Sequence, residues 1–183
     1  MPPRRLLPFK VAPTSDLTPA RWLTERLFTG APPPAVSSVV PAGYDAYVEV
    51  PLDGNDGSPE PVELVRAALA QHTDNAERCY WAMWVGWPQM QVWASEPTVS
   101  IPDGFALVLF REQFADTERV RSVTSGDETL WWPESRRWVQ ARPVDSDALY
   151  IACDRAVADS LLESGCAGAH LVDPAAPMLS DEY

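Results

Sequence analysis

Several segments of this chain are apolar on one or on both of their alternating faces, and this pattern predicts a sheet. The clearest segment is CYWAMWVGW, residues 79–87, in which both alternating faces are apolar. Such a run is typical of a central strand that is covered on both sides. Further strands are predicted at residues 47–50, 90–94, 105–111, 138–142 and 148–152.

Start and stop signals predict three helices. A Thr-Pro pair at Thr18 predicts an N-cap followed by proline at the first helical position, and Gly30 ends that helix. A second helix is predicted over residues 61–71, where apolar side chains recur every three or four positions. Asp154 is expected to cap a third helix, RAVADSLLES, which stops at Gly165.

The predicted order is helix, strand, helix, several consecutive strands and a last helix. Consecutive strands favour antiparallel pairing with segregated helices, so the predicted fold class is α+β in a single domain. Residues 1–38 are expected to form an N-terminal extension with one peripheral helix and a proline-rich linker, APPPAVSS. Residues 39–183 are expected to form the α+β domain. The linker lets the first helix lie against the main body or swing from it.

The charge of the chain is strongly negative, at −12. Residues 1–42 carry five basic and two acidic side chains, so the main body carries −15. This balance argues against a nucleic-acid partner, because duplex binding depends on Lys and Arg that neutralise phosphates. It favours a protein partner that is basic, although acidic charge also keeps many proteins dispersed in solution.

Composition also bears on the compartment. No apolar run approaches the roughly 20 residues of a membrane-spanning helix, so no membrane partner is expected. The opening MPPRRLLPFKVAP is interrupted by prolines and a lysine, which is unlike a signal sequence. Three widely spaced cysteines argue against a secreted disulfide framework and predict reduced, buried thiols in a cytoplasmic protein; they are Cys79, Cys153 and Cys166.

Catalytic and metal-binding patterns are not found in the sequence. Neither His72 nor His170 belongs to a zinc-type cluster, and there is no CxxC pair, nucleophile elbow, P-loop or dinucleotide glycine pattern. His72 is expected to end a helix and to interact with its dipole. The acidic loop DGNDGSPE resembles a calcium loop, but Leu64 stands where a bidentate Glu is needed. The sequence therefore predicts no cofactor and no metal, and it favours a role without catalysis.

The segment LWWPESRRW, residues 130–138, is the densest group of aromatic and charged side chains. Pro133 cannot donate to a sheet ladder, so a strand is expected to end there and the next to begin at Trp138. One interpretation is that large rings from this turn close one end of the core, and this interpretation is favoured. The other is an aromatic and arginine surface that binds a partner, since Trp and Arg are frequent in binding hot spots.

Two further acids follow this segment. In an extended chain Asp145 and Asp147 point to the same side, where they would hold a cation or pair with Arg136 and Arg137. They also lie between two predicted strands, where Asp and Ser often form turns. The turn is the favoured interpretation.

Three segments in order resemble a family of uncharacterised actinobacterial proteins. That family has a VPxGFxAYxR-type segment, a Trp-rich middle and an LWWPxDRxW motif, followed by a strand, an acidic turn and a strand. The resemblance covers residues 39–165, and Ser135 and Pro143 depart from it at positions where the family has acids. It supports the domain boundaries and implies no activity. The matching residues are Val40, Pro41, Gly43, Tyr44, Ala46, Tyr47, Leu130, Trp131, Trp132, Pro133, Arg136, Trp138, Asp145 and Tyr150.

A looser similarity, in fold class and acidic charge, is to SUKH-type immunity proteins. The leading hypothesis is a non-enzymatic cytoplasmic module that binds a protein partner. The alternative is an enzyme or small-molecule binder with an aromatic and arginine-lined pocket, and a third hypothesis assigns function to the N-terminal 42 residues. The candidate ligand-binding or partner-binding residues are Tyr44, Tyr47, Trp131, Trp132, Glu134, Arg136 and Asp145.

Overall fold

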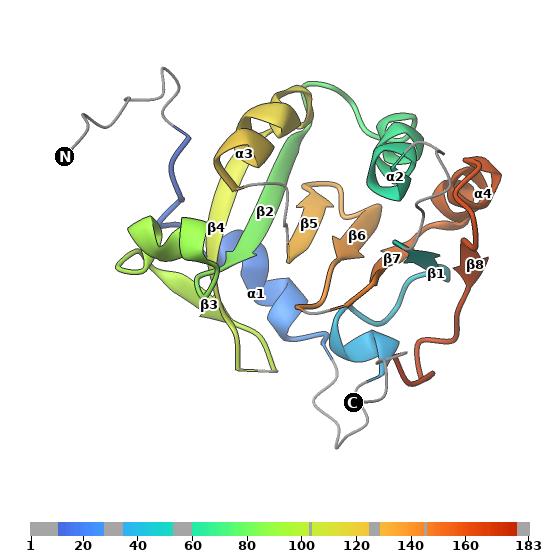
Figure 1. The fold of residues 1–183 in the computed structure, drawn as a ribbon, viewed down its shortest axis with the longest axis horizontal. Helices are drawn as coiled ribbons and strands as arrows, with labels where there is room; N and C mark the ends of the chain where they lie inside the picture. Colours follow the sequence, from blue (N-terminus) through green and yellow to red (C-terminus); the bar gives the residue numbers. More distant parts are fainter. Residues whose placement is uncertain are drawn as a thin grey trace.

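A single sheet forms the centre of the protein (Figure 1). The computed structural model describes residues 11–27, 35–52, 60–102, 104–124, 129–144 and 146–178. The strands of the sheet are β1 (Ala46–Pro51), β2 (Arg78–Trp84), β3 (Thr98–Ser100), β4 (Ala106–Gln113), β5 (Leu130–Pro133), β6 (Trp138–Ala141), β7 (Ala148–Cys153) and β8 (His170–Leu171). The α-helices are α1 (Thr18–Thr24), α2 (Pro61–Ala70), α3 (Thr117–Thr124) and α4 (Arg155–Glu163). Short 3₁₀ helices are η1 (Val36–Ser38), η2 (Pro88–Trp93) and η3 (Phe114–Asp116).

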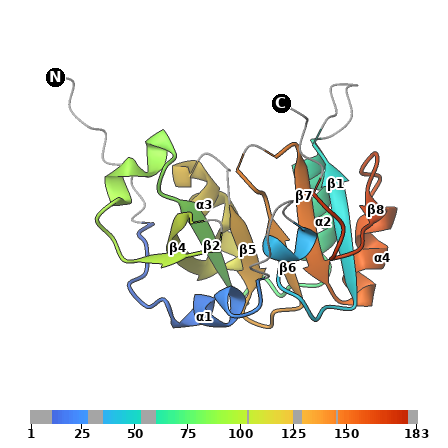
Figure 2. The ribbon, with the colours of Figure 1, turned by 90° about the horizontal axis from the view of Figure 1, so that it is seen from below.

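The strand order in the eight-stranded sheet is β3-β4-β2-β5-β6-β7-β1-β8. Figure 2 shows the strands from β4 to β8 in this order across the molecule. All neighbouring pairs are antiparallel. The predicted α+β fold with a mostly antiparallel sheet is therefore confirmed.

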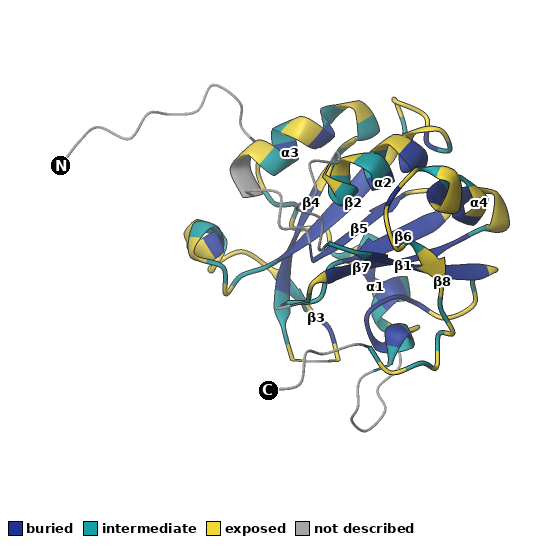
Figure 3. Cartoon of the chain, turned by 45° about the vertical axis from the view of Figure 1, so that its right-hand side comes forward, coloured by how far each residue is buried: buried dark blue, intermediate teal, exposed yellow. Residues whose placement is uncertain are grey.

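The sheet has helices on both faces, so its side chains form two cores (Figure 1). Face A carries Trp81, Trp131 and Trp138 and is covered by α2, α3 and α4. Face B carries Tyr80 and Trp132 and is covered by α1 and η1. Figure 3 shows the strands mostly buried between these layers. Burial on both faces explains why the central strands have almost no polar positions.

β2 confirms the prediction of a central strand at residues 79–87. It lies between β4 and β5, with Cys79, Trp81 and Met83 on face A and Tyr80 and Ala82 on face B. The strand ends at Trp84, earlier than the apolar pattern predicts, because the chain turns into η2.

The strand predicted at residues 90–94 is wrong, since residues 90–93 belong to η2 and Ala94 is its C-cap. Pro88 stands in the first turn of that helix, where a missing N–H costs no hydrogen bond. Met90 is fully buried and Trp93 packs its ring against Phe110 at a centroid distance of 5.2 Å. Apolar residues three apart fit a 3₁₀ helix, in which positions i and i+3 lie on one side.

The sequence does not predict β3, α3 or β8. β3 and β8 are edge strands of three and two residues. α3 lies between β4 and β5, so the predicted uninterrupted run of strands is wrong at that point.

α1 packs against face B, where Ala20 and Leu23 are buried. It begins at Thr18 with Leu17 as N-cap, so the prediction of Thr18 as N-cap is wrong by one residue. The carboxylate of Asp16 accepts the Thr18 N–H at 3.0 Å and thereby satisfies a free donor at the helix start. Of the linker, η1 is described, and its Val36 N–H donates to the carbonyl of Ala176 at 3.1 Å. α1 ends at Thr24 with Glu25 as C-cap, before the predicted stop at Gly30, which itself lies outside the described residues.

All three cysteines are free and buried, as the sequence predicts. Burial raises the pKa of the Cys153 thiol to about 12 and also raises that of Cys79. Both groups are therefore neutral thiols at pH 7, which makes them weak nucleophiles. Within the described parts of the chain, no helix combines the length and apolar character needed to cross a membrane.

Asp154 caps α4, as predicted. Its carboxylate accepts the Val157 N–H at 2.9 Å and the Arg137 Nε–H at 2.8 Å. Burial acts to raise the pKa of Asp154, but the Val157 hydrogen bond and the Arg137 guanidinium outweigh it, and the pKa is lowered. The charged form of this carboxyl is thus favoured by the fold.

We expect Asp154→Asn to lower the free energy of unfolding by about 0.5 kcal/mol at about pH 7, because Asn keeps the cap but loses the partly exposed ion pair. A lowered pKa gives stability above the unfolded pKa of about 3.9, and this stability is lost as the pH falls through the folded value. The difference between the two proteins should therefore shrink below about pH 4 in urea unfolding. A difference that grows in acid would contradict this role of Asp154.

Candidate functional site

The turn between β5 and β6 has an arginine in an unusual backbone conformation. The Arg136 N–H donates to the Pro133 carbonyl at 2.9 Å and closes the turn. Arg136 itself has φ of 58°, in the left-handed region. β5 ends at Pro133 and β6 begins at Trp138, so both predicted boundaries are confirmed. This hairpin therefore places a side chain where glycine or asparagine is the usual residue.

The guanidinium of Arg136 stacks on an aromatic ring of α1. Its central carbon lies 4.5 Å from the ring centroid of Trp22. Trp22 in turn stands edge-on against Trp132, with centroids 6.5 Å apart. Arg136 is exposed and Trp22 is half-buried, while Trp132 lies in the core beneath them.

Tyr44 fixes the backbone of the same turn from another segment. Its hydroxyl donates to the Arg136 carbonyl at 2.7 Å. Burial raises the pKa of Tyr44, against the opposing effect of Arg136 and Arg26, so the hydroxyl stays protonated and able to donate. Tyr47 is buried beneath Tyr44, and its hydroxyl accepts the Tyr44 N–H at 3.3 Å. Gly43, with φ of 97°, provides the bend that brings Tyr44 to the turn.

Glu134, at the other side of the turn, joins β5 to β2. Its carboxylate accepts hydrogen bonds from Arg78 at 3.1 Å and from the Tyr80 hydroxyl at 3.3 Å. Tyr80 stacks on Trp132 with centroids 5.6 Å apart. The hydrogen bond with Tyr80 and the charge of Glu134 raise the pKa of Arg78.

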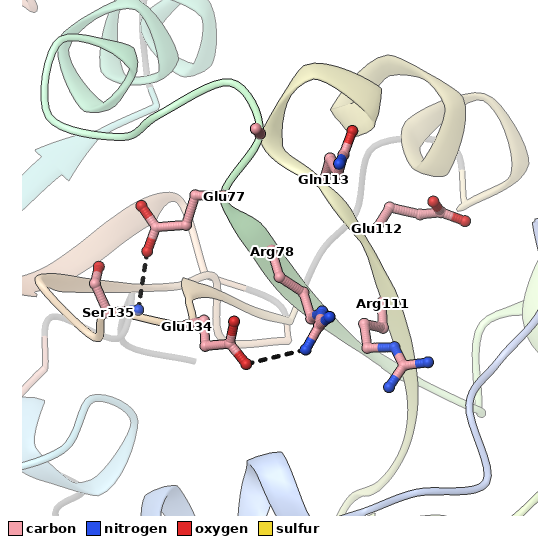
Figure 4. Close-up of a pocket in the computed structure, with 8 residues that line it drawn as sticks. Glu77, Arg78, Arg111, Glu112, Gln113, Glu134 and Ser135 are labelled. Atoms are coloured by element: carbon pink, nitrogen blue, oxygen red, sulfur yellow. Dashed lines mark hydrogen bonds and ion pairs between the residues drawn. The ribbon is translucent and has the colours of Figure 1, made fainter.

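An open cleft of about 520 Å³ lies beside Glu134, at the end of β2 and β4 (Figure 4). Figure 4 shows Arg78 and Arg111 extending from these neighbouring strands toward the same side, while Glu77 points to the Ser135 N–H, which it accepts at 2.9 Å. We name the group around the turn and the cleft the hairpin surface. It consists of Trp22, Tyr44, Arg78, Arg111, Glu134 and Arg136.

The structure brings together only part of the predicted set. Tyr44, Glu134 and Arg136 lie on the hairpin surface, with Tyr47 and Trp132 buried beneath it. The other two predicted residues are Trp131 and Asp145. Trp131 lies on face A, on the opposite side of the sheet, and Asp145 lies outside the described residues.

The rings of Trp131 and Trp132 are each 1% exposed. The favoured interpretation, in which these rings belong to the core, is therefore correct. The acidic turn is also supported for its described residues, because the Ser146 N–H donates to Pro143 O at 3.2 Å and the Ala148 N–H donates to Ser146 Oγ at 3.2 Å.

The other described clefts do not collect the predicted rings. A cleft of about 360 Å³ between α2 and α3 is lined by Arg66 and Trp131 on face A. An apolar cleft of about 310 Å³ on face B is lined by residues such as Ile101 and Leu130. Neither of them includes Tyr44, Tyr47 or Arg136, so these two do not form the aromatic and arginine-lined pocket of the alternative hypothesis.

Groups with catalytic or metal-binding potential are sparse in the described part of the chain. Within it, no three His, Cys, Asp or Glu side chains gather closely enough to hold a metal ion. His72 Nε2 lies 2.7 Å from Ser160 Oγ, a contact with α4 rather than with the last carbonyls of α2. Ser160 is in the middle of α4, where backbone N–H groups are used within the helix and do not form an oxyanion hole. The acids at 53–59 lie outside the described residues.

Sequence reasoning did not identify Trp22, Arg78 or Arg111 as part of a site. Trp22 lies within the first predicted helix, for which the sequence indicates no site. Arg78 and Arg111 stand at the ends of strands that are otherwise apolar. One signal would have identified both arginines. Each is a charged residue at the end of a strand, at a position where the alternation of side chains would place it on a buried face.

Comparisons of this chain with protein-family models, curated proteins and solved structures found no match. The resemblance to the actinobacterial family therefore stays a prediction, as does the looser similarity to immunity proteins.

Proposed function

We propose that this chain is a non-enzymatic, cytoplasmic protein-binding module that docks a partner on the hairpin surface. The observation that carries the proposal is the conformation of Arg136. A non-glycine residue in the left-handed region costs about 1–2 kcal/mol relative to ordinary backbone. Arg136 is exposed, so it does not recover this cost by filling the core. Strain of this kind at an exposed side chain is typical of a residue used in recognition.

The surroundings of Arg136 suit a binding anchor. The Tyr44 hydroxyl holds its carbonyl, and the Trp22 ring supports its guanidinium. A side chain that is already ordered loses less conformational entropy when a partner binds. Arg and Trp are also among the residues that contribute most to protein interfaces.

A binding role is favoured over catalysis by the chemistry around the surface. Its side chains are arginines, aromatic rings and a carboxylate that is already paired with Arg78. The thiols of Cys79 and Cys153 are buried and have raised pKa values. The negative main body predicts a partner that is basic overall, for which a toxin is one candidate by analogy with immunity proteins.

Arg136→Gly tests the proposal because it separates folding from recognition. Glycine relieves the backbone strain, while the lost stacking on Trp22 costs about 0.5–1 kcal/mol, so we expect the free energy of unfolding to stay within about 1 kcal/mol of wild type. A random peptide library displayed on phage would be selected on the wild-type chain. We expect selected peptides to bind Arg136→Gly at least about tenfold more weakly, a loss of about 1.4 kcal/mol.

Arg155→Ala is the matched control. Arg155 is exposed like Arg136 but lies on α4, where it pairs with Asp159. We expect this variant to bind the selected peptides as wild type does. A library that yields no peptide sensitive to Arg136→Gly would overturn the proposed function.

A further inference from the structure

We propose that the hairpin surface recognises an acidic peptide segment and that Arg78 and Arg111 together bind its carboxylates. This inference rests on the proposed function and specifies the chemistry of the partner at the contact. It differs from the expectation drawn from net charge, because it concerns the local surface rather than the whole chain.

The first observation is the distribution of arginines that lack a carboxylate partner. Most described arginines are paired, namely Arg66, Arg78, Arg119, Arg121, Arg137 and Arg155. Four others form no ion pair with a carboxylate of the described residues, namely Arg21, Arg26, Arg111 and Arg136.

These four arginines lie in two pairs, one near Asp16 and one near Tyr44. Arg111 and Arg21 both lie close enough to Asp16 to help lower its pKa, after the hydrogen bonds from Thr18. Arg136 and Arg26 both act on the hydroxyl of Tyr44, against the effect of its burial. In a chain of charge −12, the two pairs thus provide guanidinium groups that have no ion-pair partner among the described residues.

The second observation is the geometry of Arg78 and Arg111. In the β2–β4 register Arg78 is opposite Gln113 and Tyr80 is opposite Arg111. Arg78 and Arg111 are therefore diagonal neighbours on the same face of the sheet, within reach of one another's long side chains. Figure 4 shows both guanidinium groups on the same side of the cleft. Two like charges at this spacing favour an anion that hydrogen-bonds to both.

The carboxylates near the cleft do not fill this position. Glu134 accepts hydrogen bonds from Arg78 and Tyr80, and it forms no ion pair with Arg111. Glu77 accepts the Ser135 N–H. Glu112 also lines the cleft, but its register position opposite Cys79 directs its side chain away from that of Arg111. Asp16, the remaining acid that acts on this group, accepts the N–H of Thr18.

The negative charge of the rest of the chain does not prevent such binding. At physiological salt the Debye length is about 8 Å, so exposed charges farther away are largely screened. The electrostatic part of the binding free energy is then set mainly by the charged side chains that lie next to the bound peptide. A carboxylate takes two parallel hydrogen bonds from a guanidinium fork. In an extended peptide, acidic side chains two positions apart lie on one face, about 7 Å from each other, so both can reach neighbouring arginines. The aromatic rings of Trp22 and Tyr44 border the same surface and would contact the apolar part of such a segment.

The test uses the full chain and fluorescein-labelled hexaglutamate, with fluorescence anisotropy as the readout. We expect saturable binding that weakens as salt is added and that is lost with hexalysine. Arg111→Ala and Arg78→Ala should each weaken hexaglutamate binding about tenfold, since each removes a charge-assisted hydrogen bond. Arg155→Ala removes an equal charge on α4 and should leave binding unchanged. Thermal unfolding of each variant separates lost binding from lost folding. Arg111→Lys keeps the positive charge but not the two-pronged guanidinium group, so we expect it to bind hexaglutamate with intermediate affinity.

A second arm separates this inference from the proposed function. The phage-displayed peptides that depend on Arg136 are expected to be rich in Asp and Glu and to depend on Arg111. If such peptides are neutral or basic, or bind Arg111→Ala as tightly as wild type, the inference fails while the proposed function stands. If hexaglutamate binds Arg111→Ala and Arg155→Ala equally, the inference also fails. Binding of single-stranded oligothymidine that depends on Arg111 and is tighter than that of hexaglutamate would likewise overturn it in favour of phosphate recognition.

Discussion

Trp132→Ala is expected to lower the free energy of unfolding by about 3–5 kcal/mol. The ring is 1% exposed and belongs to the face B core. It stacks on Tyr80 with centroids 5.6 Å apart and meets the edge of Trp22 at 6.5 Å. Alanine would leave a large cavity between α1 and the sheet, since the surrounding strands are held by their ladders and relax only in part.

Urea unfolding of wild type and variant measures this loss directly. Val92→Ala is the control, because Val92 is 64% exposed and its truncation should change stability by less than about 0.5 kcal/mol. A loss below about 1 kcal/mol for Trp132→Ala would mean that the ring is a surface anchor and not part of the core.

Much of the sheet can be predicted because its central strands are apolar on both faces. In β2 every residue from Cys79 to Met83 is buried, so the run stands out without any knowledge of its neighbours. The corner at Pro133 can also be predicted, because proline lacks the N–H that a sheet ladder uses.

The remaining elements depend on contacts that local patterns do not contain. α3 has Val120 as its buried apolar residue among the side chains described, so it lacks the apolar stripe that identifies a helix. β3 and β8 are short edge strands whose pairing depends on β4 and β1 rather than on their own sequence. In so short a segment as η2 the pattern is ambiguous, because Met90 and Val92 fit a period of two while Met90 and Trp93 fit a period of three.

The candidate site was predictable in its centre and not in its extent. Arg136 could be singled out from the dense motif LWWPESRRW, and Tyr44 from the segment that resembles the actinobacterial family. The ring on which Arg136 stacks belongs to Trp22, in a different element, and no local pattern in LWWPESRRW indicates it. The pairing of Arg78 with Glu134 and its position diagonal to Arg111 follow from strand order and register. Register is set by the whole sheet, so these contacts appear only in the folded chain.

Trp131→Ala is expected to destabilise the fold as much as Trp132→Ala, by about 3–5 kcal/mol, but to leave the hairpin surface intact. Trp131 lies on face A, where it stacks on Trp81 and Phe114 and meets Trp138 at a centroid distance of 4.7 Å. The sheet separates this cluster from Trp22, which supports Arg136 from face B.

Binding of hexaglutamate and of the selected peptides should therefore distinguish the two neighbouring tryptophans at a temperature where both variants are folded. Trp131→Ala should keep an affinity within about twofold of wild type, or roughly 0.4 kcal/mol. Trp132→Ala removes the ring against which Trp22 packs, so it should weaken peptide binding by more than the twofold allowed for Trp131→Ala. Equal losses in the two variants would show that binding follows overall stability and not the Trp132–Trp22–Arg136 contacts. Because the two substitutions are adjacent in sequence and similar in volume, they differ mainly in the face of the sheet that they empty.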